Sequence, residues 1–285
     1  MSKIQTSIRK AREEALRLRA GESHVSESRA RHEASSSEIR QEDKAGSGIL
    51  GLFQTAQTDV EVMEESRFVS EVDDRSAIAA YKIMRTRVLQ RMRSNNWHTL
   101  LVTSAGAGEG KTLTASNLAL SISRDVNQSV LLVDLDLQRS MVAQYFGFDS
   151  EIKNGIGDYL KGTAEIPDIV YSPSGLQRIS IIPNGSVVEH ASDLLSGPRM
   201  KELLAWIQQQ SNRTIVIFDM PPVLVDDDVL AFCPEVDAVL LVVEQGKTER
   251  ALLEKAMSLL AETNFLGVVL NKCSESSGGN AYGYY

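Results

Sequence analysis

The chain has 285 residues, of which 42% are hydrophobic and 24% are charged, so it is long enough to bury a substantial core. Its formal net charge of −8 argues against nucleic acid as its main partner. No apolar run approaches the roughly 18 residues that a membrane-spanning helix needs, and the first residues carry no apolar signal-peptide core. We therefore expect a cytoplasmic protein. The two cysteines, Cys233 and Cys273, match no metal-ligand spacing and are interpreted as reduced thiols.

Residues 1–20 predict an amphipathic docking helix. Its apolar stripe has 4-3-4-3 spacing and consists of Ile4, Ile8, Ala11, Ala15 and Leu18. The opposite face is rich in Arg and Lys, and a helix this short is marginal alone in water. We expect it to dock on a partner helix or on an anionic membrane surface. A frayed terminus with helical propensity is the alternative.

Residues 21–75 are polar and lack periodicity, which is typical of a disordered linker. One short apolar interruption, Gly48 to Phe53, reads "GILGLF". It is either a small docking patch or a sticky piece of linker.

Residues 76–273 predict one globular domain. Unalternating apolar runs, each suited to a fully buried strand, occupy 98–104, 129–135, 178–183, 214–219, 238–243 and 267–271. Helical segments are expected at 112–123, 200–210 and 249–262. Buried strands that alternate with helices indicate an α/β/α sandwich around a mainly parallel sheet.

The stretch "AGAGEGKT", from Ala105 to Thr112, lies between the first of these strands and a helix. Glycines at this position let backbone N–H groups turn around a phosphate chain, and the helix N-terminus adds partial positive charge. In this pattern Lys111 reaches the β- and γ-phosphates, and the Thr112 hydroxyl binds Mg²⁺. The residues expected to contact nucleotide are Gly106, Ala107, Gly108, Glu109, Gly110, Lys111 and Thr112. The sequence thus predicts a P-loop NTPase, with Ala105 in place of the usual first glycine.

Three aspartates follow buried strands: Asp134 and Asp136 in "VLLVDLDLQRS", and Asp219 in "IVIFDMPP". The carboxyl ends of parallel strands form the edge of a sheet at which ligands bind. Carboxylates there hold Mg²⁺ and its waters against nucleotide phosphates. Helix capping is the alternative for any one of them. We therefore predict an ATP and Mg²⁺ site, with the metal held by Thr112, Asp136 and Asp219, directly or through water.

From about Ala79 to its end the chain resembles the bacterial tyrosine kinases (BY-kinases) of capsule and exopolysaccharide synthesis. "VLLVDLDLQRS" resembles the second Walker-type motif of that family, and "IVIFDMPPVLVDDD" resembles its Walker B strand. "SDLLSGPRMKELL" resembles the family segment "ELLSSxxxxxLL", and "GVVLNK" followed by a polar spacer and tyrosines resembles its ending. The resemblance implies an ATP-dependent protein-tyrosine autokinase. It also implies that residues 274–285 are a flexible tail that offers Tyr282, Tyr284 and Tyr285 to a neighbouring subunit as phosphate acceptors.

The resemblance suggests roles for the site residues. Lys111 and Mg²⁺ would neutralise the transferring phosphoryl group. Asp134 would accept or orient the tyrosine proton, although Asp134 and Asp136 could exchange roles. Asn271 would contact adenine or cap its strand.

Two features concern partners. The subunit-contact motif of the family, "ExxRxxR", has Ala79, Lys82 and Arg85 here, which weakens the prediction of a ring-shaped homo-oligomer. The N-terminal helix resembles the start of an exopolysaccharide- and exosortase-associated subgroup. We therefore expect it to dock on a membrane partner related to polysaccharide chain-length regulators, at the inner membrane.

Two other functions remain open. A positioning ATPase of the MinD/ParA class shares this fold, but it carries a signature lysine where this chain has Gly106. An ATP-binding scaffold of polysaccharide assembly with little turnover would use the same site without phosphotransfer.

Overall fold

The computed structural model describes residues 53–65, 68, 75–186, 188, 191–210 and 213–273. All of them belong to the second of the two units into which the chain divides, Ile49–Tyr285. The predicted helix at 1–20 and the predicted tyrosine tail at 274–285 lie outside the described residues.

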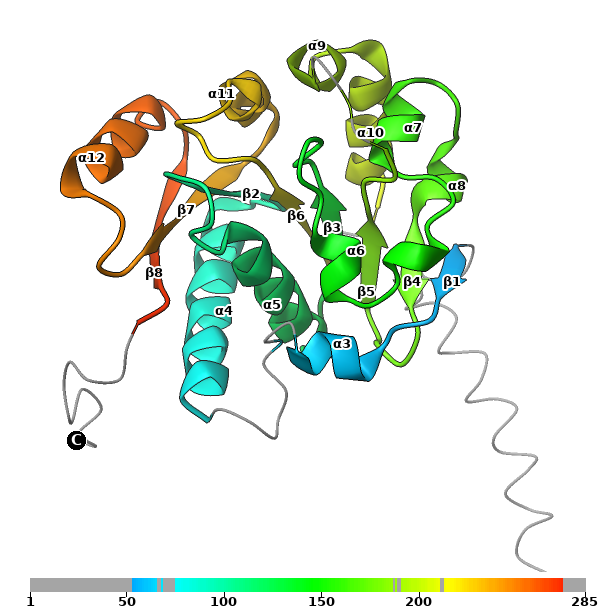
Figure 1. The fold of residues 1–285 in the computed structure, drawn as a ribbon, viewed down its shortest axis with the longest axis horizontal. Coiled ribbons are helices and arrows are strands. Elements are labelled where there is room, and N and C mark those ends of the chain that lie inside the picture. The colour runs from blue at the N-terminus through cyan, green and yellow to red at the C-terminus, as the bar shows by residue number, and fades with distance from the viewer. Residues whose placement is uncertain are drawn as a thin grey trace, which may run out of the picture. The chain divides into compact units, whose positions relative to one another are not determined.

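The centre of this unit is an eight-stranded sheet with the order β1-β4-β5-β3-β6-β2-β7-β8 (Figure 1). The strands are β1 Gln54–Ala56, β2 Thr99–Ser104, β3 Ser129–Asp134, β4 Tyr171–Pro173, β5 Ile179–Ile182, β6 Thr214–Asp219, β7 Ala238–Glu244 and β8 Phe265–Asn271. Neighbouring strands are parallel except for the pair β4 and β5. The six predicted strands are confirmed: the bounds of β6 are the same as predicted, and those of the other five differ by one or two residues.

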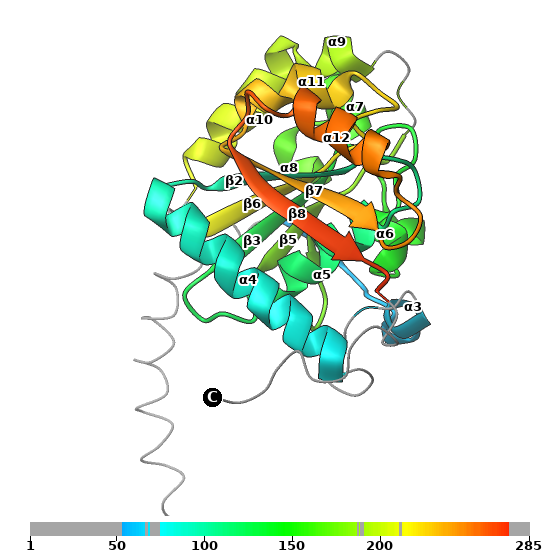
Figure 2. The same cartoon turned by 90° about the vertical axis from the view of Figure 1, so that its left-hand side faces the viewer.

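Helices cover both faces of the sheet (Figures 1 and 2). They are α3 Val60–Glu65, α4 Arg75–Asn95, α5 Lys111–Ser123, α6 Val142–Tyr145, α7 Ile156–Leu160, α8 Ile166–Ile169, α9 Ala191–Leu195, α10 Pro198–Gln208, α11 Asp228–Phe232 and α12 Arg250–Leu259, with 3-10 turns at Asp149–Glu151 and Cys233–Glu235. Helices α4 and α5 lie on one face, and α10, α11 and α12 lie on the other. The predicted three-layer α/β fold is confirmed.

The prediction of a disordered linker over residues 21–75 is wrong for part of that range. Within 21–75 the structure places β1 and α3, and Gln54 in β1 pairs with Tyr171 in β4. Phe53, the last residue of the apolar patch, lies edge-on to Trp206 with 6.1 Å between ring centroids. Strands of three residues are too short to show a period, so only contacts with distant segments reveal them.

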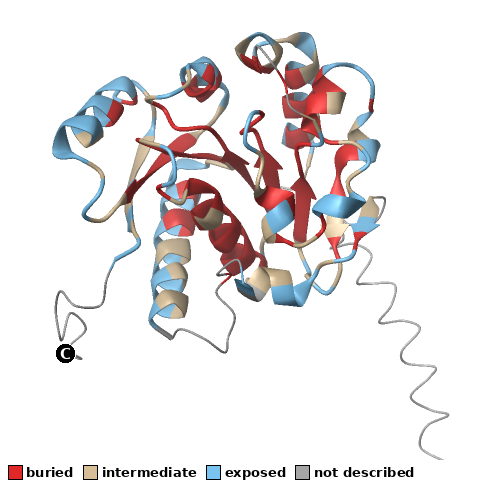
Figure 3. Ribbon diagram, viewed as in Figure 1, coloured by how far each residue is buried: buried red, intermediate tan, exposed pale blue. Residues whose placement is uncertain are grey.

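The buried strands explain the predicted apolar runs. Two hydrophobic cores, one on each face of the sheet, are filled by alternate side chains of β2, β3, β6 and β7. Figure 3 shows that these strands are buried along most of their length. Burial of each Val, Leu or Ile side chain contributes about 1.5–3 kcal/mol. Among the helices that the structure describes, none is both long and apolar enough to cross a membrane.

The sheet brings the predicted site together. Strands β3 and β6 are adjacent and parallel, and Asp134 lies opposite Asp219 in their register. Strand β2, which leads into the glycine-rich loop, pairs with β6 on its other side. The loop and the aspartates therefore meet at one edge of the sheet, as ligand sites in parallel sheets do.

Candidate active site

The glycine-rich loop runs from β2 into α5, as the P-loop prediction required. Gly108 and Gly110 have φ values of +77° and +90°, which residues with a Cβ rarely adopt. A Cβ on Gly110 would also collide with the amide nitrogen of Asn271. Gly110 immediately precedes the first residue of α5, so the loop ends at a helix N-terminus. This is the geometry of a phosphate-binding loop.

Contacts from distant segments fix the loop. The Glu109 carboxylate accepts a hydrogen bond from the Gly106 backbone N–H at 2.9 Å and another from the Thr248 hydroxyl. The Asn271 amide donates to the Glu109 carbonyl oxygen at 2.9 Å, and the Lys272 ammonium donates to the Gly108 carbonyl oxygen at 2.7 Å. Glu109 and Asn271, which were predicted to contact nucleotide, thus hold the loop itself.

Sequence reasoning missed Thr248 and the role of Lys272. Thr248 precedes α12 and is 139 positions from Glu109, and no local pattern links the two. Lys272 lies within the quoted "GVVLNK" motif, so a signal existed there, but it did not indicate the contact with Gly108.

The Lys111 ammonium lies among the predicted metal ligands. Its nitrogen is 2.8 Å from a carboxylate oxygen of Asp136, 3.5 Å from one of Asp219 and 3.1 Å from the Thr112 hydroxyl oxygen. All four residues are buried. The structure therefore brings together the lysine, the hydroxyl and two of the three aspartates that the sequence singled out.

Burial and charge oppose one another in this cluster. Burial by itself would lower the pKa of Lys111, but the carboxylates of Asp219 and Asp136 outweigh it and raise that pKa. Burial raises the pKa of Asp219, and Lys111 opposes this rise. The lysine is therefore firmly protonated, and it faces more carboxylates than it can neutralise.

The donor set fits the cofactors that a P-loop NTPase uses. The side chains of Thr112, Asp136 and Asp219 offer oxygen atoms around the position of one cation, and oxygen ligands are those that Mg²⁺ prefers. The backbone of the adjoining loop offers N–H groups to phosphates. The residues present therefore fit a nucleotide and a divalent metal.

Asp134 has a different environment. One of its carboxylate oxygens accepts hydrogen bonds from the Ser140 hydroxyl at 2.7 Å and from the backbone N–H groups of Met141 and Val142 at 3.2 and 3.1 Å. The residue is completely buried. Burial, followed by repulsion from Asp219, raises its pKa from the ordinary 3.8 to about 7. Asp134 thus organises the loop between β3 and α6.

Replacing Asp134 with Asn should flatten the pH dependence of stability. Because the pKa of Asp134 is raised in the folded state, the folded protein holds more protons than the unfolded chain between about pH 4 and 7. The free energy of unfolding therefore falls as pH rises through this window. Asn keeps an acceptor for Ser140 but does not titrate. Urea unfolding at pH 5 and pH 8 should show a smaller difference for Asp134→Asn than for the wild type.

Asp149→Asn, a change at an exposed carboxylate, is the matched control. It should leave the wild-type difference between the two pH values in place. An Asp134→Asn chain that loses as much stability as the wild type between pH 5 and 8 would contradict the prediction.

A cavity of about 1590 Å³ adjoins the loop, and it is large enough for a nucleotide. Lys111, Thr112 and Asp136 line its polar end. The rest of its lining includes apolar residues of α4 and β8, such as Met84 and Val269, together with the arginines Arg87, Arg91 and Arg139. Asp136 thus faces the cavity, and Asp134 is not among its lining residues.

Comparison with known proteins agrees with this geometry. Residues 100–282 match the family model described as the CobQ/CobB/MinD/ParA nucleotide binding domain. The tyrosine-protein kinase YwqD of Bacillus subtilis is 31% identical over 209 residues, which cover 72% of this chain and 84% of that protein. The tyrosine-protein kinase CpsD of Streptococcus agalactiae serotype Ia is 31% identical over 179 residues, which cover 62% of this chain and 75% of that protein.

A solved structure shows the same likeness. The kinase domain of the Escherichia coli tyrosine kinase ETK superposes with a TM-score of 0.64 and 27% identity, over 82% of this chain and 96% of that one. The fold and the phosphate loop define a P-loop nucleotide-binding domain of the CobQ/CobB/MinD/ParA type. Within that class, the chain belongs to the bacterial protein-tyrosine kinases. The resemblance seen in the sequence is confirmed, and a positioning ATPase is less favoured.

Proposed function

We propose that this protein-tyrosine kinase transfers the γ-phosphoryl group of ATP to the C-terminal tyrosines of a second copy of itself. By this activity it regulates the polymerisation and export of an exopolysaccharide or capsule. The observation that supports the proposal most is the cluster of Lys111, Thr112, Asp136 and Asp219 at the polar end of the cavity. A chain that also ends in Tyr282, Tyr284 and Tyr285 carries its own acceptors.

The phosphates would replace the carboxylates as partners of Lys111. Its ammonium now contacts Asp136 and Asp219, and a short movement of its flexible stem would direct it to the β- and γ-phosphates. The backbone N–H groups of residues 106–112 would bind the phosphate oxygens. Bound Mg²⁺, held by Thr112, Asp136 and Asp219, would supply further positive charge for the transferring group.

The acceptor hydroxyl requires a carboxylate that can reach it. Asp136 lines the cavity, whereas Asp134 is completely buried and already accepts hydrogen bonds from Ser140, Met141 and Val142. The sequence favoured Asp134 for the tyrosine proton and left an exchange of roles open. The geometry supports Asp136 as the carboxylate that orients the tyrosine hydroxyl, in addition to its proposed contact with the metal, and it supports Asp134 as the residue that holds the loop that carries Asp136.

The proposed partners are a second copy of the chain and a membrane polysaccharide chain-length regulator. Residues 1–20 would bind the regulator and so associate the protein peripherally with the inner membrane. In the contact motif on α4, the Arg85 guanidinium donates to the Ser121 carbonyl oxygen at 2.9 Å within the same subunit. Arg85 thus joins α4 to α5 within one subunit, and its hydrogen bond to Ser121 does not require a neighbouring subunit.

Replacing Tyr282, Tyr284 and Tyr285 with Phe should remove most phosphotyrosine from the protein. The purified chain and this variant would be incubated with Mg·ATP, and the label would be mapped by mass spectrometry. Phe lacks only the acceptor hydroxyl, so ATP affinity, measured on the same samples, should stay unchanged. Label that persists at other tyrosines in the variant would refute the tail as the acceptor. Absence of label in both proteins despite ATP binding would favour the scaffold.

A further inference from the structure

The nucleotide cavity is larger than one nucleotide requires. Its volume is about 1590 Å³, whereas sites for single small ligands typically have roughly 300–1,000 Å³. The part that the nucleotide site does not use lies between α4 and β8, which run side by side at one edge of the sheet (Figure 2). We call this part the α4–β8 groove, and it is lined by Met84, Arg87 and Arg91 of α4 and by Leu266 and Val269 of β8. A second group therefore has room beside the nucleotide.

Two arginines of α4 give the groove a positive charge. Arg87 and Arg91 are both exposed, and because they are four residues apart they lie on the same face of the helix. The Arg91 guanidinium donates to the Leu266 carbonyl oxygen at 3.1 Å, which leaves further N–H groups for another acceptor. Among the described residues, no carboxylate forms an ion pair with either guanidinium. The groove is therefore suited to an anionic group.

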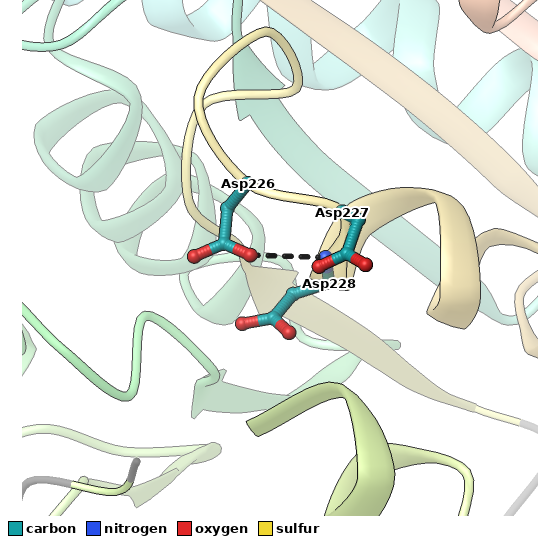
Figure 4. Close-up of side chains that lie close together, drawn as sticks. All are labelled: Asp226, Asp227 and Asp228. Carbon is teal, nitrogen blue, oxygen red and sulfur yellow. Dashed lines mark hydrogen bonds between the residues drawn. The ribbon is translucent and has the colours of Figure 1, made fainter. Parts of the chain in front are cut away.

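The charge is opposite at the polar end of the cavity. Asp136 lies there, and Gln138, two residues further on, donates to Asp226 at 2.9 Å. One carboxylate oxygen from each of Asp226, Asp227 and Asp228 lies within 4.8 Å of the others (Figure 4). This acidic turn repels anionic groups other than the phosphates that the glycine-rich loop binds. An anion that is not part of the nucleotide is therefore favoured at the arginines.

The chain continues from this cavity into the tyrosine tail. Cys273, the last described residue, lines the cavity. Tyr282 follows nine positions later, and nine extended residues span at most about 30 Å. Leu266, which contacts Arg91, is seven positions before Cys273, which is about 23 Å along a strand. The tail is therefore long enough to bring Tyr282 to either arginine of its own subunit.

The charge of the tail fits the arginines once the tail is phosphorylated. Residues 274–285 include Glu275 and no Lys or Arg, and each phosphotyrosine adds a charge of about −1.5 to −2. A guanidinium binds phosphate through two N–H groups, and the apolar walls of the groove offer a surface to the phenyl ring. Residues 1–20, the other segment that we expect to dock, are rich in Arg and Lys, so the arginines would repel them.

We propose that the α4–β8 groove binds the phosphorylated tail of the same subunit, with a phosphotyrosine phosphate held by Arg87 and Arg91. This inference rests on the proposed function, because the tail must first be labelled. Binding in cis withdraws the labelled tail from the site of the neighbouring subunit, so that an unlabelled tail can enter that site. The nucleotide keeps the polar end of the cavity.

The first test is the binding of a fluorescent synthetic peptide of residues 274–285 that carries phosphate on all three tyrosines. The full chain with Tyr282, Tyr284 and Tyr285 replaced by Phe is the binding partner, because it carries no phosphotyrosine in its own tail. Fluorescence anisotropy should give a micromolar affinity, and the unphosphorylated peptide should bind at least about tenfold more weakly. Saturating Mg·ATP should not displace the phosphopeptide.

Substitutions on α4 locate the site. In the same full chain, Arg87→Gln and Arg91→Gln should each weaken phosphopeptide binding by at least about fivefold, since each removes one charged donor. Arg87 has no hydrogen bond or ion pair to another described residue, so Arg87→Gln should also leave the melting temperature unchanged. Arg93→Gln, a change on the same helix at a residue that pairs with Asp125 at 3.8 Å, is the matched control and should retain full affinity.

The second test concerns binding in cis. The full chain is assembled by ligation of a synthetic segment 273–285 at Cys273, with or without the phosphates, so that no kinase activity is needed. The phosphorylated chain should bind the free phosphopeptide at least about tenfold more weakly than the unphosphorylated chain, because its own tail occupies the groove at a high effective concentration. Association of the phosphorylated chains into larger species, measured by sedimentation, would instead show binding between subunits and overturn the arrangement in cis.

Three results of the first test would overturn the groove as the site. They are equal affinity for the two peptides, unchanged affinity in both Arg87→Gln and Arg91→Gln, and displacement of the phosphopeptide by Mg·ATP, which would place its phosphate at the glycine-rich loop. Because the phosphates are synthetic, failure of the proposed function is recognised separately. It would appear as a phosphopeptide that binds as expected to a chain that forms no label with Mg·ATP.

Discussion

Lys111→Met should reduce phosphotyrosine formation by at least about 10²–10³-fold. This is the effect of removing one preorganised donor that stabilises charge in a transition state. The ammonium that lies 2.8 Å from Asp136 is positioned to meet the phosphates, and Met keeps the apolar stem while it removes the charge. The initial rate of label transfer from Mg·ATP measures the effect. Lys255→Met, an exposed substitution on α12, is the matched control and should retain the wild-type rate.

A mixing experiment extends this prediction to the direction of transfer. The Lys111→Met chain keeps its tail, and an active chain that ends at Asn280 lacks all three acceptors. Each alone should stay unlabelled at the tail. Together they should produce label on the tail of the Lys111→Met chain, because one subunit supplies the site and the other supplies the tyrosine. Labelling of Lys111→Met at the wild-type rate when it is alone would show that Lys111 is not part of the machinery.

Gly110→Ala should weaken ATP binding by at least about 100-fold, which corresponds to about 2.7 kcal/mol. At φ +90° a Cβ is strained by itself, at a cost of about 1–2 kcal/mol. In addition, the new Cβ would collide with the Asn271 amide, which holds the Glu109 carbonyl oxygen at 2.9 Å. Either the loop loses its phosphate-binding conformation, or Asn271 moves away and no longer holds the Glu109 carbonyl oxygen. Calorimetric titration with ATP measures the loss of affinity, and a thermal melt measures the loss of stability.

Gly162→Ala separates the strain from the collision. Gly162 has a similar φ, +80°, but a Cβ there would meet nothing within 4 Å, and the residue does not line the nucleotide cavity. This variant should melt at a slightly lower temperature and bind ATP as the wild type does. Equal ATP affinities for both glycine variants would mean that the shape of the loop does not depend on Gly110.

The predictable parts of this protein are those that local chemistry specifies. Strands buried on both faces must be apolar along their whole length, so β2, β3 and β6 were visible as continuous runs. A phosphate loop requires glycine, lysine and threonine at fixed spacing, so its residues were visible before any fold was known. The position of Asp134 and Asp219 followed from one further rule, that the carboxyl ends of parallel strands share an edge.

The sequence by itself therefore determined the α/β class, the nucleotide site and the kinase family. Only the tertiary structure decided that β1 completes the sheet within a predicted linker, that Thr248 and Lys272 fix the loop, and that Asp136 rather than Asp134 faces the cavity. The physical reason is the same in each case. These features depend on contacts between residues far apart in the chain, 139 positions for Glu109 and Thr248, and no period or motif in the sequence indicates which distant residues make contact.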